Sequence, residues 1–307
     1  MNLKSRHFLS ILDFSTEEIL EVLKTARKLK DQKGVHKPPP LPNKTLAMIF
    51  QKPSLRTRVS FEVGMTQLGG HAIYLAPTDI KLGERETTED IALVLSRYAD
   101  AVMARVFGHK IVEDLAKSSG VPVINGLSDF EHPCQILADL QTIQERKNRL
   151  EGLKLCYVGD GNNVCHSLIY AAARLGMTAI AITPPGYEPQ ADVVNKAKGI
   201  GAATGAKVHV TPDLDAAAGA DVLYTDVWAS MGQEAEAEAR KKIFRDYRID
   251  GDLVKKADRD AVILHCLPAH YGDEIEYEAS RLPNSAIFDQ AENRLHAQKA
   301  LLVHLLT

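Results

Sequence analysis

Short apolar segments alternate with longer helical segments along this 307-residue chain, and this alternation limits the possible folds more than any other feature. The short segments are rich in β-branched residues, and the longer ones place apolar residues at helical spacing. Strands that alternate with helices in this way predict parallel strands joined by helical crossovers. The chain is therefore predicted to adopt an α/β fold.

The alternation occurs in two series. The first series contains LAMIF, HAIYLA, DAVMARV and VPVING, and the second contains LKLCYVG, TAIAIT, KVHVT, DVLYTDVW and AVILHCLPA. One long helical segment separates them, so we expect two doubly wound domains with central parallel sheets, joined by interdomain helices. The expected domains are residues 1–148 and residues 149–290, and the helix of residues 291–307 is expected to pack back on the first domain.

The composition is that of an ordinary globular protein. The formal net charge of -3 gives no reason to expect nucleic acid or a membrane as the main partner. No apolar run approaches the ~20 residues of a membrane span, and the first residues show no signal-peptide pattern. The four cysteines form no CxxC pair, so we expect reduced thiols and a cytoplasmic location.

The segment FQKPSLRTRVSFEVG places Arg56 and Arg58 in the first turn of a predicted helix that follows a strand. Cations are unfavourable there because the helix dipole already puts partial positive charge at that end. Ligands of open α/β sheets bind beyond the carboxyl ends of the strands, which is where this segment lies. Ser54, Thr57 and Arg56 could hold a phosphate together with the free N–H groups of the first turn. A solvated helix start with ordinary arginines is the alternative.

Polar residues also follow two other strands of the first series. Arg105 ends DAVMARV, where a charge is costly unless it faces a ligand or a carboxylate. FEHPCQ follows VPVING and contains His132, which could donate to a carbonyl oxygen, and Gln135, which could accept from an amide. From spacing alone, a loop histidine and a helix-start glutamine without a binding role are the favoured interpretation.

The segment YVGDGNNV suggests a dinucleotide site, because Gly159 and Gly161 follow a strand. However, Val164 replaces the third glycine, and the next strand offers no nearby acid for a ribose. The alternative is that Asn162 and Asn163 use this turn to bind something smaller.

Two strand ends of the second series carry candidate polar groups. Asp226 ends DVLYTD, where a helix cap or a turn is the simple interpretation. ILHCLPAH carries Cys266 and His270, which could suggest zinc, but no second ligand pair has suitable spacing. A Cys/His nucleophile pair is possible, although adjacent strand residues such as His265 and Cys266 are expected to point to opposite faces.

Seven segments, taken in order, resemble those of the transcarbamylase family: SLRTR, MARVFGH, HPCQ, DGNNV, DVWASMG, HCLPAH and AENR. They cover essentially the whole chain, and DVWASMG and HCLPAH are similar to the forms in the family's ornithine branch rather than its aspartate branch. The resemblance implies a carbamoyl phosphate domain followed by an amino-acid domain. It implies carbamoyl transfer to L-ornithine without a metal or other cofactor, and trimers with shared active sites.

The resemblance also implies roles for individual residues. Arg105 and His132 would act on the carbonyl of carbamoyl phosphate, and Cys266 would line the carbamoyl group and the attacking amine, so these three are the expected catalytic residues. The expected carbamoyl phosphate ligands are Ser54, Leu55, Arg56, Thr57, Lys81, Arg105, His132, Gln135, Cys266, Leu267 and Arg294. The expected ornithine ligands are Asn163, Asp226, Ser230 and Met231. Arg58 is expected to pair with a carboxylate, and Leu267–Pro268 is expected to be a cis peptide.

Such a reaction needs no nucleophile from the protein, because the ornithine δ-amine attacks and phosphate is a good leaving group. It needs positioning and fixed positive dipoles at the carbonyl oxygen, and domain closure that excludes water. It also needs the neutral amine, which arginine-rich surroundings favour.

Two residues depart from the family pattern. Lys81 lies in a loop that the resemblance places at a neighbouring subunit's phosphate site. A lysine in this loop resembles the sequence of the family's aspartate enzymes. Tyr271 follows HCLPAH where an arginine is common. Aspartate, putrescine and an N-acylated ornithine thus stay open as alternative acceptors. The alternative functions are those of an NAD-dependent oxidoreductase and of a non-catalytic small-molecule binder.

Overall fold

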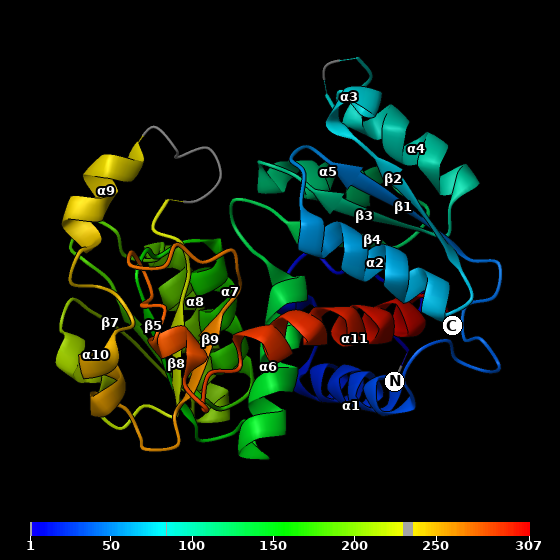
Figure 1. Cartoon of the computed structure of the whole chain (residues 1–307). Helices are drawn as coiled ribbons and strands as arrows, with labels where there is room; N and C mark the ends of the chain where they lie inside the picture. The colour runs from blue at the N-terminus through cyan, green and yellow to red at the C-terminus, as the bar shows by residue number, and fades with distance from the viewer. Residues whose placement is uncertain (1, 84, 230–235) are drawn as a thin grey trace. The chain divides into compact units, whose positions relative to one another are not determined.

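The computed structural model describes residues 2–83, 85–229 and 236–307. The chain divides into two compact units (Figure 1): unit 1 is Met1–Gln141 with Glu292–Thr307, and unit 2 is Thr142–Ala291. The domain boundary between residues 148 and 149 stays a prediction. The chain passes from one unit to the other within two helices, α6 (Pro133–Lys147) and α11 (Ile287–Leu306).

Unit 1 contains a four-stranded parallel sheet with the strand order β2-β1-β3-β4. Its strands are β1 (Thr45–Phe50), β2 (His71–Leu75), β3 (Ala101–Arg105) and β4 (Val123–Leu127). All five residues of β4 are buried, as expected for a parallel strand that is covered on both faces. Because all four strands are parallel, their carboxyl ends lie at one edge of the sheet.

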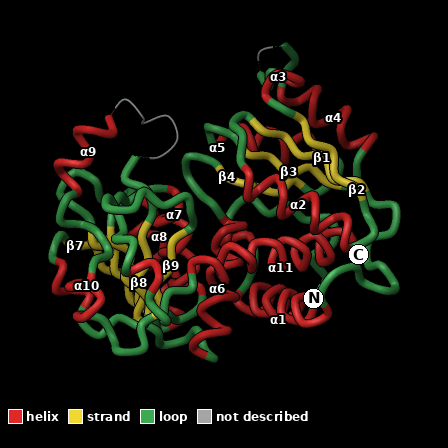
Figure 2. Tube along the Cα trace, viewed as in Figure 1, coloured by secondary structure: helices red, strands yellow, loops and turns green. Residues whose placement is uncertain are grey.

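Helices connect and cover these strands, as Figure 2 shows in red against the yellow strands. They are α1 (Thr16–Gln32), α2 (Leu55–Gln67), α3 (Pro77–Ile80), α4 (Thr88–Tyr98) and α5 (His109–Ser118), with the short 3-10 helix η1 (Ile11–Asp13) before them. α1 begins at a capping box in which Ser15 accepts from the Glu18 N–H and Glu18 accepts from the Ser15 N–H. The part of α11 from Glu292 belongs to unit 1, where Asn293 accepts from Lys30 of α1 (2.8 Å).

Unit 2 contains a five-stranded parallel sheet with the strand order β7-β6-β5-β8-β9. Its strands are β5 (Lys154–Val158), β6 (Thr178–Ile182), β7 (Lys207–Thr211), β8 (Val222–Thr225) and β9 (Val262–His265). Its remaining elements are α7 (Asn163–Arg174), α8 (Ala191–Thr204), η2 (Leu214–Ala217), α9 (Ala237–Phe244), α10 (Gly251–Lys256) and η4 (Ala279–Arg281). The strand order reverses direction beside β5, which creates the switch point where ligands of such sheets bind.

The predicted fold class is confirmed, since two helix-covered parallel sheets make up the chain. None of the described helices combines the length and the apolar character that crossing a membrane requires.

Candidate functional site

The SLRTR segment opens α2, immediately after the β1 strand and its short connection. Ser54 is the N-cap, and its side chain accepts from the Thr57 N–H (3.4 Å). The predicted pairing of Arg58 is confirmed, because its Nε lies 2.9 Å from Glu62 and its guanidinium lies over the Tyr74 ring. Arg58 is thus held along the outside of α2.

A cluster of hydrogen-bonded polar side chains joins α11 to α2 and α6 within unit 1. Arg294 donates to the Gln135 carbonyl oxygen (2.7 Å) and to the Thr57 hydroxyl (3.4 Å). The Gln135 amide nitrogen in turn donates to Asp139 (2.8 Å). This contact orients the carboxamide, so that its oxygen faces Arg294. Three elements therefore bring Thr57, Gln135 and Arg294 together, and Arg294 is 3% exposed.

The positive charge of this region acts on His132, which precedes α6 and is 5% exposed. Burial lowers the pKa of His132 well below its ordinary value, and the charges of Arg294, Arg105 and Arg56 lower it further. Arg105 reaches this region because it is the last residue of β3. His132 is therefore a neutral imidazole that can donate one hydrogen bond to an oxygen without adding a full charge.

We expect the neutral form of His132 to be measurable. Its folded pKa is depressed, so protonation should be absent throughout the range from pH 8 to pH 6, where an exposed histidine with a pKa of about 6.5 titrates. Ring-nitrogen chemical shifts of labelled protein would report this, with His132→Asn identifying the signal. A His132 signal that titrates at the ordinary pKa would contradict the assignment.

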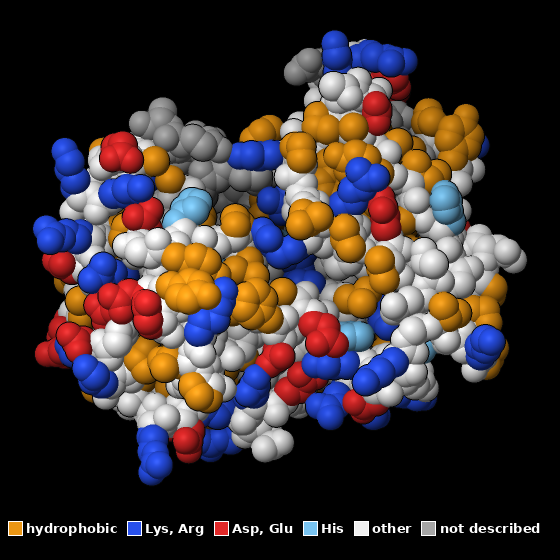
Figure 3. All heavy atoms as spheres, viewed as in Figure 1, with side chains coloured by type: hydrophobic (Ala, Val, Ile, Leu, Met, Phe, Trp, Pro, Cys, Tyr) orange, Lys and Arg blue, Asp and Glu red, His pale blue; other side chains and the backbone are white. Residues whose placement is uncertain are grey.

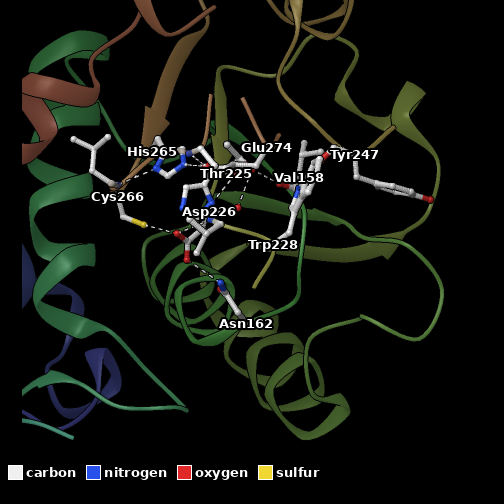
Figure 4. A network of polar contacts seen from close by, with 12 residues as sticks. Val158, Asn162, Thr225, Asp226, Trp228, Tyr247, His265, Cys266 and Glu274 are labelled. Carbon is white, nitrogen blue, oxygen red and sulfur yellow. Dashed lines mark hydrogen bonds and ion pairs between the residues drawn. The ribbon is translucent and has the colours of Figure 1, made fainter. Parts of the chain in front are cut away.

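In unit 2, Asp226 follows β8 and is held by two groups (Figure 4). The Asn162 amide donates to one carboxylate oxygen (2.8 Å), and the Cys266 thiol donates to the other (2.9 Å). Asn162 is itself fixed as the N-cap of α7, where its oxygen accepts from the Val164 N–H (3.0 Å). Asn163, the first residue of α7, is buried beside it.

A fully buried pair supports the segment that carries Cys266 (Figure 4). The Leu267 N–H donates to Nδ1 of His265 (2.8 Å), so Nδ1 carries no proton and the Nε2 proton is donated to Glu274 (3.0 Å). The same oxygen of Glu274 accepts from the His270 N–H (2.6 Å). Leu267 has a positive φ of 58°, and the predicted cis Leu267–Pro268 peptide is confirmed.

One expectation about this segment is corrected. β9 ends at His265, so the alternation of a strand does not extend to Cys266. The ligand atoms of Asp226, His265 and Cys266 lie within 4.8 Å of one another, and the two side chains do not diverge. This set fits a metal ion poorly, because both ring nitrogens of His265 already make hydrogen bonds that hold the segment.

The turn after β5 does not offer the open backbone that a pyrophosphate requires. A Cβ atom at Gly161 would lie 2.2 Å from the Pro189 nitrogen and 2.4 Å from the Glu188 carbonyl carbon. The glycine is needed because this chain's own backbone approaches it closely. The dinucleotide interpretation of YVGDGNNV therefore loses its physical basis.

The comparison with protein families matches both halves of the chain. Residues 6–145 match the "Aspartate/ornithine carbamoyltransferase, carbamoyl-P binding domain", and residues 151–305 match the "Aspartate/ornithine carbamoyltransferase, Asp/Orn binding domain". The chain belongs to the aspartate/ornithine carbamoyltransferase family. The resemblance inferred from the seven sequence segments is confirmed.

Among curated relatives, the ornithine carbamoyltransferase of Pyrococcus horikoshii is 56% identical over 308 residues, covering 100% of this chain and 97% of the relative. Among solved structures, ornithine carbamoyltransferase from Pyrococcus furiosus is 54% identical with a TM-score of 0.95, covering 100% of this chain and 98% of the other. Anabolic ornithine carbamoyltransferase from Campylobacter jejuni is 40% identical with a TM-score of 0.92, covering 97% of each chain.

The sequence-predicted residues of this aspartate/ornithine carbamoyltransferase family member fall into two groups, one in each unit. Unit 1 holds Ser54, Leu55, Arg56, Thr57, Lys81, Arg105, His132, Gln135 and Arg294, and unit 2 holds Asn163, Asp226, Cys266 and Leu267. Ser230 and Met231 lie outside the described residues. Lys81 is the exposed C-cap of α3 with a left-handed backbone.

Sequence reasoning assigned no role to Glu274 and did not predict the contacts of Asn162 and His265. Asn162 was indicated by its place in the strand-to-helix turn, but not as the partner of Asp226. His265 was considered only beside Cys266. Its pairing with Glu274 gave no signal, because a buried pair nine residues apart in an irregular segment follows no helical or strand period. Tyr271, the departure from the family pattern, is half-exposed beside the Arg281 guanidinium.

Proposed function

We propose that this protein transfers the carbamoyl group of carbamoyl phosphate to the δ-amine of L-ornithine, giving L-citrulline and phosphate in arginine biosynthesis. The observation that carries the proposal is the full-length match to relatives named ornithine carbamoyltransferase, with both family domains present. The biosynthetic direction rests on the relatives whose names include "anabolic".

Carbamoyl phosphate is proposed to bind in unit 1. The phosphate would accept from the N–H groups at the start of α2 and from Arg56, because a helix N-terminus and a guanidinium both stabilise an anion. Arg105 and His132 would donate to the carbonyl oxygen, and Gln135 with Arg294 would hold the carbamoyl end. The ligands proposed for this substrate from unit 1 are Ser54, Leu55, Arg56, Thr57, Arg105, His132, Gln135 and Arg294. Cys266, Leu267 and Lys81 of a neighbouring subunit are proposed as its further ligands.

Ornithine is proposed to bind in unit 2. The Asp226 carboxylate, fixed by Asn162 and Cys266, offers an anion to an amino group. Cys266 and Leu267 would line the reacting amine and the carbamoyl group, while Asn163, Ser230 and Met231 would contact the rest of the amino acid.

The reaction then follows from charge placement. The neutral δ-amine attacks the carbamoyl carbon, the carbonyl oxygen gains negative charge, and phosphate leaves and can accept the amine proton. The neutral His132 and the arginines that surround it stabilise the developing oxyanion, because preformed dipoles need no reorganisation during the step. A free alkylamine has a pKa above ~10, and a cationic neighbourhood opposes its protonation.

Steady-state assays with different acceptors test the proposal. We expect L-ornithine to give the highest kcat/KM when aspartate, putrescine and N-acetylornithine are compared with it, because a site that hydrogen-bonds charged groups rejects analogues that leave them unpaired. Citrulline formation would be measured by colour reaction and mass. A higher kcat/KM for another acceptor, or absence of citrulline with pure folded protein, would overturn the proposal.

We also propose a homotrimer, or a multiple of trimers, with active sites shared between subunits. α2 and α4 expose large hydrophobic side chains that a monomer has no reason to leave in water, and Figure 3 shows such side chains gathered over these two helices. They are Leu55, Val59, Val63, Leu93, Val94 and Tyr98. A cytoplasmic location is proposed as well, since all four cysteines are free thiols.

Lys81 supplies a test of the shared site. We expect Lys81→Ala and Arg56→Ala homotrimers each to be poorly active, because a lysine reaching a neighbour's dianion adds a compact positive charge. Dissociated and reassembled together, they should regain activity, since some hybrid sites receive both intact residues. Each variant reassembled alone is the control. Full activity of Lys81→Ala, or inactive hybrids whose formation has been demonstrated, would disprove sharing through Lys81.

A further inference from the structure

Unit 1 contains a groove that lies outside the proposed catalytic residues. It is formed by one face of α1, the segment of residues 35–40 that follows, and Val303 of α11, and its volume is about 760 Å³. α1 and α11 lie side by side there (Figure 1), where Thr25 and His304 are 2.9 Å apart. The volume is within the range of sites for small organic molecules, which is roughly 300–1,000 Å³.

The groove is positively charged although the whole chain has a formal net charge of -3. Lys24, Lys28 and Lys37 line it, and Glu21 is the acidic residue among the described residues that do so. Glu21 pairs with Lys24 (3.2 Å), whereas Lys28 and Lys37 have no carboxylate partner in the described part of the chain. The groove therefore has an excess of cations.

Two features make this excess unfavourable without a ligand. Lys24 and Lys28 are four residues apart on α1, an arrangement in which like charges destabilise a helix. A further cation lies behind the wall: the Lys299 Nζ is 3.2 Å from Nε2 of His36, which lines the groove and is 5% exposed. Burial lowers the pKa of Lys299 to about 8, so it is still mainly protonated at pH 7.

The wall of the groove is hydrogen-bonded to α1, α2 and α11, and it is partly apolar. His36 accepts from Lys299 at Nε2, so Nδ1 carries the proton and donates to Gln32 (3.0 Å). Lys299 also donates to Gln67 at the end of α2 (2.8 Å). The apolar lining consists of Leu29, Val35, Pro38, Pro40 and Val303. An apolar surface beside several lysines suits a ligand that has both an organic part and phosphates.

We propose that this groove binds a phosphorylated organic anion of nucleotide size, with its phosphates on Lys24, Lys28 and Lys37 and its organic part on the apolar lining. The site is separate from the residues proposed for carbamoyl phosphate. Binding there would offset the positive charge of Lys28 and Lys37, which have no carboxylate partner in the described part of the chain.

Calorimetric titration of the full-length protein with ATP tests the proposal. The test variant is Lys28→Glu with Lys37→Glu, and the matched control is Lys117→Glu with Lys198→Glu, two exposed lysines elsewhere. Two such changes lower the formal net charge by 4, from -3 to -7, in both proteins. We expect the groove variant to lose affinity for ATP by about tenfold or more and the control to stay within about twofold of wild type.

A second titration of the wild-type protein uses tripolyphosphate in place of ATP. Tripolyphosphate should bind more weakly than ATP, because it lacks a part that contacts the apolar lining, and equal affinity would overturn that half of the proposal. Citrulline formation without ATP should be the same in the groove variant and the control, which separates this site from catalysis. The melting temperature of the groove variant should be no lower than that of the control, because Lys28→Glu removes a like-charge pair on α1, and this separates the site from folding. Absence of saturable ATP binding to wild type, or ATP affinity that survives in the groove variant, would overturn the proposed site.

Discussion

Replacing Arg56 by alanine should weaken carbamoyl phosphate binding by about tenfold to a hundredfold while the fold stays intact. A hydrogen bond to a charged group contributes roughly 1.5–3 kcal/mol, and every 1.4 kcal/mol is about a factor of ten in affinity. Arg56 lies at the start of α2, where the helix dipole gives it no stabilisation, and its charge reaches the buried His132. Arg56 is thus placed where it can add a charge-assisted hydrogen bond to an anion at the start of α2.

Arg58→Ala is the matched control for this variant. Arg58 lies in the same turn but is paired with Glu62 and stacked on Tyr74, so its removal should leave the affinity for carbamoyl phosphate close to that of wild type. Calorimetry with each variant, at one fixed salt concentration, gives the comparison. Equal affinity of Arg56→Ala and Arg58→Ala would show that the charge at the helix start does not bind the phosphate.

The fold and the site segments of unit 1 could be predicted because their signals are local. A strand run followed by a cap and a helical period identified β1, Ser54 and α2 without any long-range information. Parallel strands then place the residues that follow them at one edge of a sheet, so SLRTR, Arg105 and the segment before α6 could be grouped from topology alone.

The geometry of the unit 2 site could not be predicted in the same way. The Asp226 carboxylate is held by Cys266, which is 40 residues away, and by Asn162, which is 64 residues away. Such pairs depend on which strands are neighbours, and sequence alone left the order of β5, β8 and β9 open. β9 ends at His265, one residue before Cys266. Because Cys266 lies just outside the strand, the direction of its side chain does not follow the alternation of strand residues.

Glu274 offers a sharper test of the segment that carries Cys266. Its side chain and that of His265 are fully buried, and it accepts from the His265 imidazole and from the His270 N–H. Through His265 it holds the Leu267 N–H, and Leu267 has a left-handed backbone that costs of order 1–3 kcal/mol for a residue with a side chain. The pair therefore keeps Leu267 in a conformation that it would otherwise leave.

We expect Glu274→Ala to destabilise the protein by about 1–3 kcal/mol, because it leaves the buried Nε2–H of the neutral His265 and the His270 N–H unpaired. Where the variant is still folded, citrulline formation should fall by about tenfold or more, as the Cys266 and Leu267 segment loses its support. Glu274→Gln is the matched control, since its amide oxygen can accept from both donors, and it should keep most of the stability and activity. Denaturant unfolding and steady-state kinetics at one temperature give both quantities. If Glu274→Ala and Glu274→Gln lose activity equally, hydrogen bonding to His265 and His270 is not what positions Cys266.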